Sequence, residues 1–393
     1  MAPKGAEYQE IAHQRAIEKK THVTFPQLKY PSLRDSALKD PVQWLTGKAM
    51  DDGAEGLWRV HNGLYDLTEF LHKHPGGSEW LDLTKGTDIT EAFESHHLNS
   101  SVNKTLEKFY VRDAKTPRNS PFVFEDDGFY RTLRRAIFEE LKKVPKDTHK
   151  KSDRIIDGDF RVSHALSHHL YPNTLMDLEI SAFEPLVYWN PRKDKPFYSK
   201  HFALLIECLY FPFTFLVLFF TRFISALVRK GYYTNHFHFT DLVGALVPVW
   251  MWLASGCTFY EAFTMWLWII CTGSLIFYTT GSNAAHHHPD IWKDGDQPSY
   301  KTETPDWGMH ELEAVMDRKD INGSHFRILT FFGNHALHHL FPTLDHAVLT
   351  YLYPVFLEHV KKYRANFRLT SQFDLFIGQY KSALKTDFKV YDD

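Results

Sequence analysis

Cysteine is scarce in this sequence: the 393 residues contain only three, and no two of them stand in a C-x-x-C spacing. This scarcity excludes a disulfide framework and a zinc ribbon. Cys208, Cys257 and Cys271 lie in apolar stretches, so we expect buried free thiols. An excess of charge of one sign is also lacking, since the formal net charge is −3. Without a basic field, nucleic acid is not an expected partner.

An apolar segment is missing from the start of the chain, where MAPKGAEYQEIAHQRAIEKK carries charges throughout. This stretch is therefore not a secretory signal peptide. Residues 1–38 are polar and contain Pro26 and Pro31, which break long helices, so we expect a loosely ordered N-terminal arm. Histidine is abundant instead, with 24 residues, and aromatic side chains reach 16%. Most tryptophans fall in the second half, as in a membrane protein.

Residues 39–113 have the pattern of a compact domain. The short runs LWRV and LYDL flank Asn62-Gly63, which predicts a β-hairpin. TEFLHKHPGG then predicts a helix that a proline ends, leaving His74 at a loop. A second helix over Thr87–Phe93 leads to His96 and His97. Two loop histidines beside an apolar pocket can bind a haem iron from both faces, whereas an arbitrary pair is more often a surface feature.

The run LWRVHNGLYDLTEFLHKHPGG resembles the signature of the cytochrome b5 family, in which the histidine of HPGG is an axial haem ligand. The resemblance implies that role for His74. In b5 domains fused to desaturases, the second ligand follows a phenylalanine by a few positions. It therefore falls on His97, after Phe93, with His96 as the alternative. The resemblance also implies haem b as a cofactor and an α+β fold for this domain.

Residues 114–160 are a charged linker with one predicted helix, from Phe129 to Lys143. Its apolar residues recur every four positions, which makes the helix amphipathic. Such a helix can pack on the following domain or lie along a membrane, and packing is the commoner fate.

Residues 161–393 combine three apolar stretches, at 201–228, 239–256 and 259–281, with three histidine clusters. Each stretch approaches the length of a membrane span. In the last cluster, GNHALHHLFPTLDH, His335, His338 and His339 stand at i, i+3 and i+4 and share one helix face. Three imidazoles on one face can bind iron, copper or zinc, and the alternative is a polar surface helix.

HALSHHLYPNTLMDLE and HALHHLFPTLDH resemble the second and third histidine boxes of integral-membrane fatty acid desaturases and hydroxylases. The resemblance implies a di-iron site that oxidises a fatty acyl chain with O2, with no catalytic residues expected beyond the metal ligands. The implied ligands are His164, His168, His169, His286, His335, His338 and His339. It also implies a multi-pass protein of the endoplasmic reticulum membrane, in contact with lipid, with a cytosolic b5 domain. Cytochrome b5 reductase is the implied electron source, and the tethered haem acts at a high effective concentration.

The histidine boxes must lie on one side of the membrane, so an even number of crossings separates His169 from His286. We expect 202–228 not to cross, since basic residues follow it, and 239–256 with 259–281 to form a spanning hairpin that turns near Cys257.

One element of the desaturase pattern has no counterpart. Between residues 98 and 200 there is neither a first histidine box nor a membrane hairpin beside it. The expected fold is thus a b5 domain followed by an all-α membrane domain that lacks its first hairpin. As a whole the chain resembles the insect family of cytochrome b5-related proteins, and a splice form or an incomplete gene model would each produce this gap. Two functions follow: a desaturase-type oxidoreductase, or a membrane-anchored b5 electron carrier with an inert desaturase-like domain.

Overall fold

The structure is a computed structural model of the whole chain. It describes residues 5–18, 23–26, 28–29, 41–146, 148, 161–174, 176–180, 183–228, 243–282, 286–300, 302, 304–322, 325–331 and 333–391.

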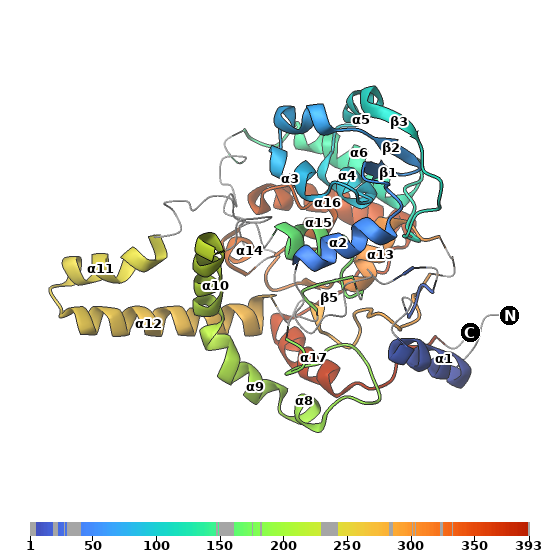
Figure 1. Cartoon of the computed structure of the whole chain (residues 1–393). Coiled ribbons are helices and arrows are strands. Elements are labelled where there is room, and N and C mark those ends of the chain that lie inside the picture. Colours follow the sequence, from blue (N-terminus) through green and yellow to red (C-terminus); the bar gives the residue numbers. More distant parts are fainter. Residues whose placement is uncertain are drawn as a thin grey trace.

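The first folded unit is a three-stranded antiparallel sheet with short helices around it (Figure 1). Its elements are α2 (Pro41–Asp51), β1 (Trp58–Val60), β2 (Gly63–Tyr65), η1 (Thr68–Lys73), α3 (Ser78–Leu83), α4 (Thr90–His96), α5 (Val102–Leu106), η2 (Glu107–Phe109) and β3 (Tyr110–Asp113). The predicted hairpin is confirmed, but its turn lies one residue earlier than Asn62-Gly63. Val60 pairs with Gly63, and His61 in the turn has a φ of 53°.

The second unit is helical and contains both histidine boxes. Its elements are η4 (Arg161–His168), α8 (Phe197–His201), α9 (Ala203–Tyr210), η5 (Phe211–Phe213), α10 (Thr214–Val228), α11 (Val243–Ser255), α12 (Phe259–Ile276), η7 (Phe277–Ser282), α13 (Trp307–Ala314), β4 (Asp317–Arg318), α14 (His325–Phe331), α15 (His335–Leu340), α16 (His346–Tyr363), β5 (Leu369–Thr370) and α17 (Gln372–Leu384). The expectation of an all-α domain is wrong in one detail, because β4 and β5 pair in parallel. A parallel pair can join segments that are distant in the chain.

Helix α6 (Phe129–Leu141) lies between the two units (Figure 1). The predicted amphipathic helix is confirmed, and its apolar face is buried at Phe129, Leu133 and Ile137. The same hydrophobic core includes Trp44 from the first unit and Leu337 from the third histidine box. The two units therefore share part of one core, and the first unit has a second, smaller core of its own around Trp58 and Leu81.

Helices α9 to α12 extend away from this core, with α11 and α12 side by side (Figure 1). Two segments are long and apolar enough to cross a membrane, Phe259–Thr280 and Ala203–Phe220. The second lies in the stretch 202–228 that we expected not to cross, and that expectation stays a prediction. Helix α11 covers 13 residues, which spans about 20 Å and is short of a bilayer core. The start of the predicted 239–256 span lies outside the described residues. The pairing of 239–256 with 259–281 as a membrane hairpin thus stays a prediction.

The three cysteines are free thiols, but the expectation that they are buried is wrong. Cys208 and Cys257 are exposed and Cys271 is partly exposed. All three belong to the apolar helices or to the turn that joins two of them, whose outer faces no other described element covers.

The N-terminal arm is more ordered than the sequence led us to expect. Helix α1 (Gly5–Glu18) packs against the end of the chain, where Phe388 N–H donates to Gln9 Oε1 at 3.0 Å. Farther on, Thr24 N–H donates to Asp294 Oδ1 at 3.0 Å. Local composition did not reveal these contacts because each joins residues more than 250 positions apart. The first part of the arm is therefore attached to the second unit.

Candidate functional site

The rings of His74 and His97 face each other between η1 and α4, with centroids 6.2 Å apart. An iron bound at about 2 Å to one nitrogen of each ring requires roughly this separation. Nδ1 of His74 donates to Gly77 O at 2.8 Å, and Nδ1 of His97 donates to Phe93 O at 2.9 Å. These bonds orient both rings and leave Nε2 of each with a lone pair for a metal. The pair fits the two axial ligands of a haem.

His96, the alternative second ligand, has different surroundings. Its ring lies 5.9 Å from that of Trp80, and its Nδ1 is 2.9 Å from Ala92 O. Burial lowers the pKa of His96 to about 4. The geometry therefore favours His97. Apolar rings lie against both histidines, with Phe70 6.0 Å from His74 and Phe93 4.9 Å from His97 between ring centroids. The partly buried apolar residues that pack against the core of this unit are Tyr65, Phe70, Leu71, Ala92, Phe93, Leu106 and Phe109.

The predicted metal ligands of the second and third boxes come together in two groups. The first contains His164, His169 and His338, with one nitrogen of each within 4.8 Å of the others. Nε2 of His164 lies 3.0 Å from Nε2 of His169. Two nitrogens bound to one metal at about 2.1 Å and at right angles lie roughly 3 Å apart. This group has the spacing of a partial metal site.

The second group contains His168, His286 and His339 within the same limit of 4.8 Å. Nε2 of His286 lies 3.0 Å from Nε2 of His168 and 2.6 Å from Nε2 of His335. All seven histidines proposed as metal ligands thus belong to one cluster built from η4, the segment after η7, and α15.

Burial and mutual repulsion keep five of these imidazoles neutral, which is the form that binds a metal. The pKa is lowered well below its usual range at His169, His286, His335, His338 and His339. His339 is fully buried, and among the described residues its Nε2 has no hydrogen-bond partner. A buried polar atom without a partner is costly, so a metal at this nitrogen would satisfy it. The residues present fit non-haem iron or a similar metal.

Carboxylates lie behind two of the histidines. Nδ1 of His164 is 2.9 Å from Glu179 Oε1, and Nδ1 of His168 is 2.9 Å from Asp177 Oδ2. Burial opposes a positive charge on His168, but the charges of Asp177 and Glu179 outweigh it and raise the pKa of His168 to about 9. Such partners orient a ligand ring and raise its basicity. Neither carboxylate was among the predicted site residues, although both lie in the LMDLE segment that closes the second box.

Two further side chains in the cluster were not among the predicted ligands, although His346 is the last residue of the third box. Glu311 is fully buried on α13, with Oε2 3.4 Å from Nδ1 of His339, and burial raises the pKa of its carboxyl group well above the usual range. The ring of His346 lies 4.3 Å from that of His338. Glu311 is far from either box in the chain, so only the tertiary structure brings it to His339.

The backbone of His286 is held by two buried donors. Lys293 Nζ donates to His286 O at 3.1 Å, and Asn173 Nδ2 donates to the same oxygen at 3.3 Å. Asn173 adopts a φ of 58°, which asparagine tolerates better than most residues. Since Asn173 follows the second box closely, it ties that box to the His286 segment.

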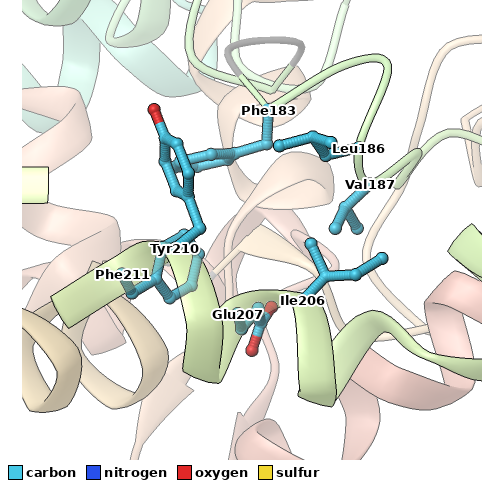
Figure 2. Close-up of a pocket in the computed structure, with 7 residues that line it drawn as sticks. All are labelled: Phe183, Leu186, Val187, Ile206, Glu207, Tyr210 and Phe211. Carbon is cyan, nitrogen blue, oxygen red and sulfur yellow. The ribbon is translucent and has the colours of Figure 1, made fainter. Parts of the chain in front are cut away.

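A shallow pocket lies at the base of α9 (Figure 2). It is lined by Phe183, Leu186, Val187, Ile206, Glu207, Tyr210 and Phe211. The space of about 180 Å³ between its lining atoms includes open solvent, so the enclosed volume is well below the roughly 300 Å³ at which small-molecule sites begin. Glu207 is buried here and accepts a hydrogen bond from Tyr380 O–H at 2.7 Å. The pocket marks the junction of α9 with α17 rather than an acyl-chain site.

Comparison with known families agrees with this two-part architecture. Residues 47–115 match the cytochrome b5-like haem/steroid-binding domain, and residues 158–371, more than half of the chain, match the fatty acid desaturase family. No solved structure matches the chain.

The chain is also similar to individual proteins. It is 36% identical to the cytochrome b5-related protein of Drosophila melanogaster over 419 aligned positions, which cover 91% of this chain and 95% of the relative. Because 91% of 393 residues is about 358, roughly 60 of those positions have no residue in this chain. The cytochrome b5-related protein of Drosophila virilis is 49% identical over 32% of this chain and 87% of its own length. Delta(5) fatty acid desaturase A of Dictyostelium discoideum is 36% identical over 22% of this chain and 19% of its own length.

Proposed function

Because this chain belongs to the fatty acid desaturase family and to the cytochrome b5-related proteins, we propose that it is a membrane oxidoreductase that oxidises a fatty acyl chain. The observation that carries the proposal is the pair of three-histidine groups, each with its nitrogens within 4.8 Å. Non-haem iron bound there supplies the activation of O2 that an unactivated C–H bond requires. The b5 domain supplies the electrons.

In this proposal His74 and His97 are the axial ligands of haem b. Each Nδ1–H donates to a backbone carbonyl, which fixes the ring plane and directs Nε2 toward the iron. The metal site takes its ligands from the seven clustered histidines. Asp177 and Glu179 orient two of those rings through hydrogen bonds, and Glu311 lies 3.4 Å from the Nδ1 of a third, His339.

The site requires the acyl chain to approach from a bilayer, and the two apolar segments long enough to span one support this. We infer a location in the endoplasmic reticulum membrane with the b5 domain cytosolic, where a cytochrome b5 reductase can reach the haem. The crevice supports this arrangement because His74 borders the exposed residues 75–77.

One observation favours a second function. The roughly 60 aligned positions that have no residue in this chain add up to the size of a membrane hairpin with a first histidine box. Without that segment each metal has fewer imidazole ligands and binds more weakly. The chain would then act as a membrane-anchored b5 electron carrier with an inert desaturase-like domain.

The ratio of non-haem iron to haem in detergent-purified protein distinguishes the two functions. We expect two non-haem irons per haem for the oxidoreductase, measured by plasma emission spectroscopy alongside the haem absorbance. The double variant His168→Ala/His339→Ala provides the matched control, and it should lose non-haem iron while keeping haem. Haem without non-haem iron in the unaltered protein would refute the oxidoreductase and leave the electron carrier.

A further inference from the structure

Helix α4 connects the haem crevice to the metal cluster. It ends at His96, directly before His97, and three acidic residues on or next to it are buried, namely Asp88, Glu91 and Glu94. In a surface helix of an independent b5 domain, such carboxylates would be in water. Here they meet partners from the second unit and from the segment that joins the two.

The hydroxyl group of Tyr130, on α6, bridges α4 and the third histidine box. It lies 3.1 Å from Glu94 O and 3.2 Å from Leu340 O, so it donates its hydrogen to two carbonyls at once. Leu340 directly follows His339. A single side chain therefore joins the haem-ligand helix to the backbone beside a metal-cluster histidine.

The ring of Tyr130 also reaches the second box. It packs edge-on against Trp307, with centroids 4.8 Å apart, and the indole N–H of Trp307 donates to Leu170 O at 3.2 Å. Leu170 directly follows His169. A separate contact joins α4 to the same box, since Tyr171 O–H donates to Glu91 Oε2 at 3.3 Å.

Buried ion pairs hold α4 in this position. Glu94 binds Arg131 and Arg134 of α6, and its side chain is only 3% exposed. Arg118 binds Asp88 at 2.7 Å and Glu91 at 2.6 Å. Charges this far from water are screened little by salt. These pairs would have to break if α4 moved away from α6 and from Arg118.

We propose that the b5 domain donates electrons from this docked position, without leaving it, and that Tyr130 is the positioning residue that couples helix α4 to both histidine boxes. The proposal rests on the proposed function, since it requires both haem and non-haem iron. One electron leaves the ferrous haem, which becomes ferric, and reduces one ferric ion of the metal site to ferrous. No bond forms or breaks, and the reductant is a flavin or flavoprotein.

The test is an anaerobic flash experiment on the full chain in detergent, loaded with haem and non-haem iron. Photoreduced 5-deazaflavin reduces the haem, and the decay of the ferrous haem absorbance reports the electron moving to the metal site. No O2 or acyl substrate is present, so the measurement is independent of turnover. Tyr130→Phe removes only the hydroxyl group, and we expect it to slow the decay several-fold with the haem potential and iron content unchanged.

Tyr363→Phe is the matched control. Tyr363 also bonds to the α6 region, accepting from Thr132 Oγ1 at 2.9 Å and donating to Asp127 O at 2.8 Å, but it touches neither α4 nor a histidine box. In Tyr363→Phe the ferrous haem absorbance should decay at the same rate as in the unaltered protein. If Tyr130→Phe and Tyr363→Phe had equal decay rates with non-haem iron bound in both, the role of Tyr130 would be overturned. If the unaltered protein binds no non-haem iron, the proposed function fails and the coupling fails with it.

Ionic strength tests the docked position separately. A domain that must undock and rebind through charged surfaces transfers electrons more slowly as salt rises. We expect the decay rate to be the same at low and high ionic strength, because the ion pairs are buried. A rate that falls steeply with salt would overturn donation from the docked position.

Discussion

The substitution Glu94→Gln measures how strongly the two units are joined. Burial alone would raise the pKa of Glu94, but hydrogen bonds from His61 and Arg131 and the charges of Arg134 and Arg131 outweigh it and lower the pKa to about 2. An unperturbed glutamate titrates near 4.5. The glutamine keeps the size of the side chain, removes its charge and replaces one acceptor oxygen with an NH2 group that cannot accept from an arginine.

The size of the effect follows from this difference in pKa. A difference of one in pKa corresponds to about 1.4 kcal/mol. The ionised carboxylate of Glu94 therefore contributes about 3 kcal/mol to the free energy of unfolding at neutral pH. Because the pKa is lower in the folded protein, this contribution is fully present above the unfolded value. It is lost as the pH falls from about 5 toward about 2. The glutamine variant cannot show this loss.

Urea unfolding in mild detergent, followed by the haem absorbance, measures the free energy. At pH 7 we expect Glu94→Gln to lower it by about 3 kcal/mol, which moves the urea midpoint down by roughly 1 M or more. The difference from the unaltered protein should narrow below pH 5. Glu139→Gln is the control, because Glu139 of α6 also forms an ion pair, with Lys142, but its side chain is 66% exposed. This variant should lower the free energy of unfolding by less than about 1 kcal/mol. A Glu94→Gln effect no larger than this control would refute the reasoning.

Two further predictions concern the cofactor sites. His74→Ala and His97→Ala should each abolish the low-spin, six-coordinate optical spectrum of the haem, whereas His96→Ala should keep it. If His96→Ala abolished this spectrum and His97→Ala kept it, the second ligand would be His96. Asp177→Asn should weaken non-haem metal binding by about 10- to 100-fold, measured by competition with a chelator, because Asp177 orients His168. The control is Asp194→Asn, because Asp194 pairs with Arg192 on the surface, and it should leave the metal affinity unchanged. Equal metal affinities in Asp177→Asn and Asp194→Asn would show that Asp177 has no part in the metal site.

The sequence by itself determined the features that depend on local order. The HPGG turn positions His74, the four-residue period of α6 predicts its buried face, and the i, i+3, i+4 spacing gathers His335, His338 and His339 on α15. These patterns are short, and each satisfies its geometry within one or two turns of helix or one hairpin. The same holds for the two desaturase-type boxes.

The tertiary structure alone decided what the local patterns are joined to. Glu311 lies behind His339, the N-terminal arm binds Asp294, and Tyr130 links α4 to both boxes, although no local spacing relates these residues. The tethered b5 domain that the sequence predicted is instead docked through a shared core and buried ion pairs. Such contacts arise from packing between segments that are distant in the chain, where burial makes an unpaired charge costly and so selects its partner.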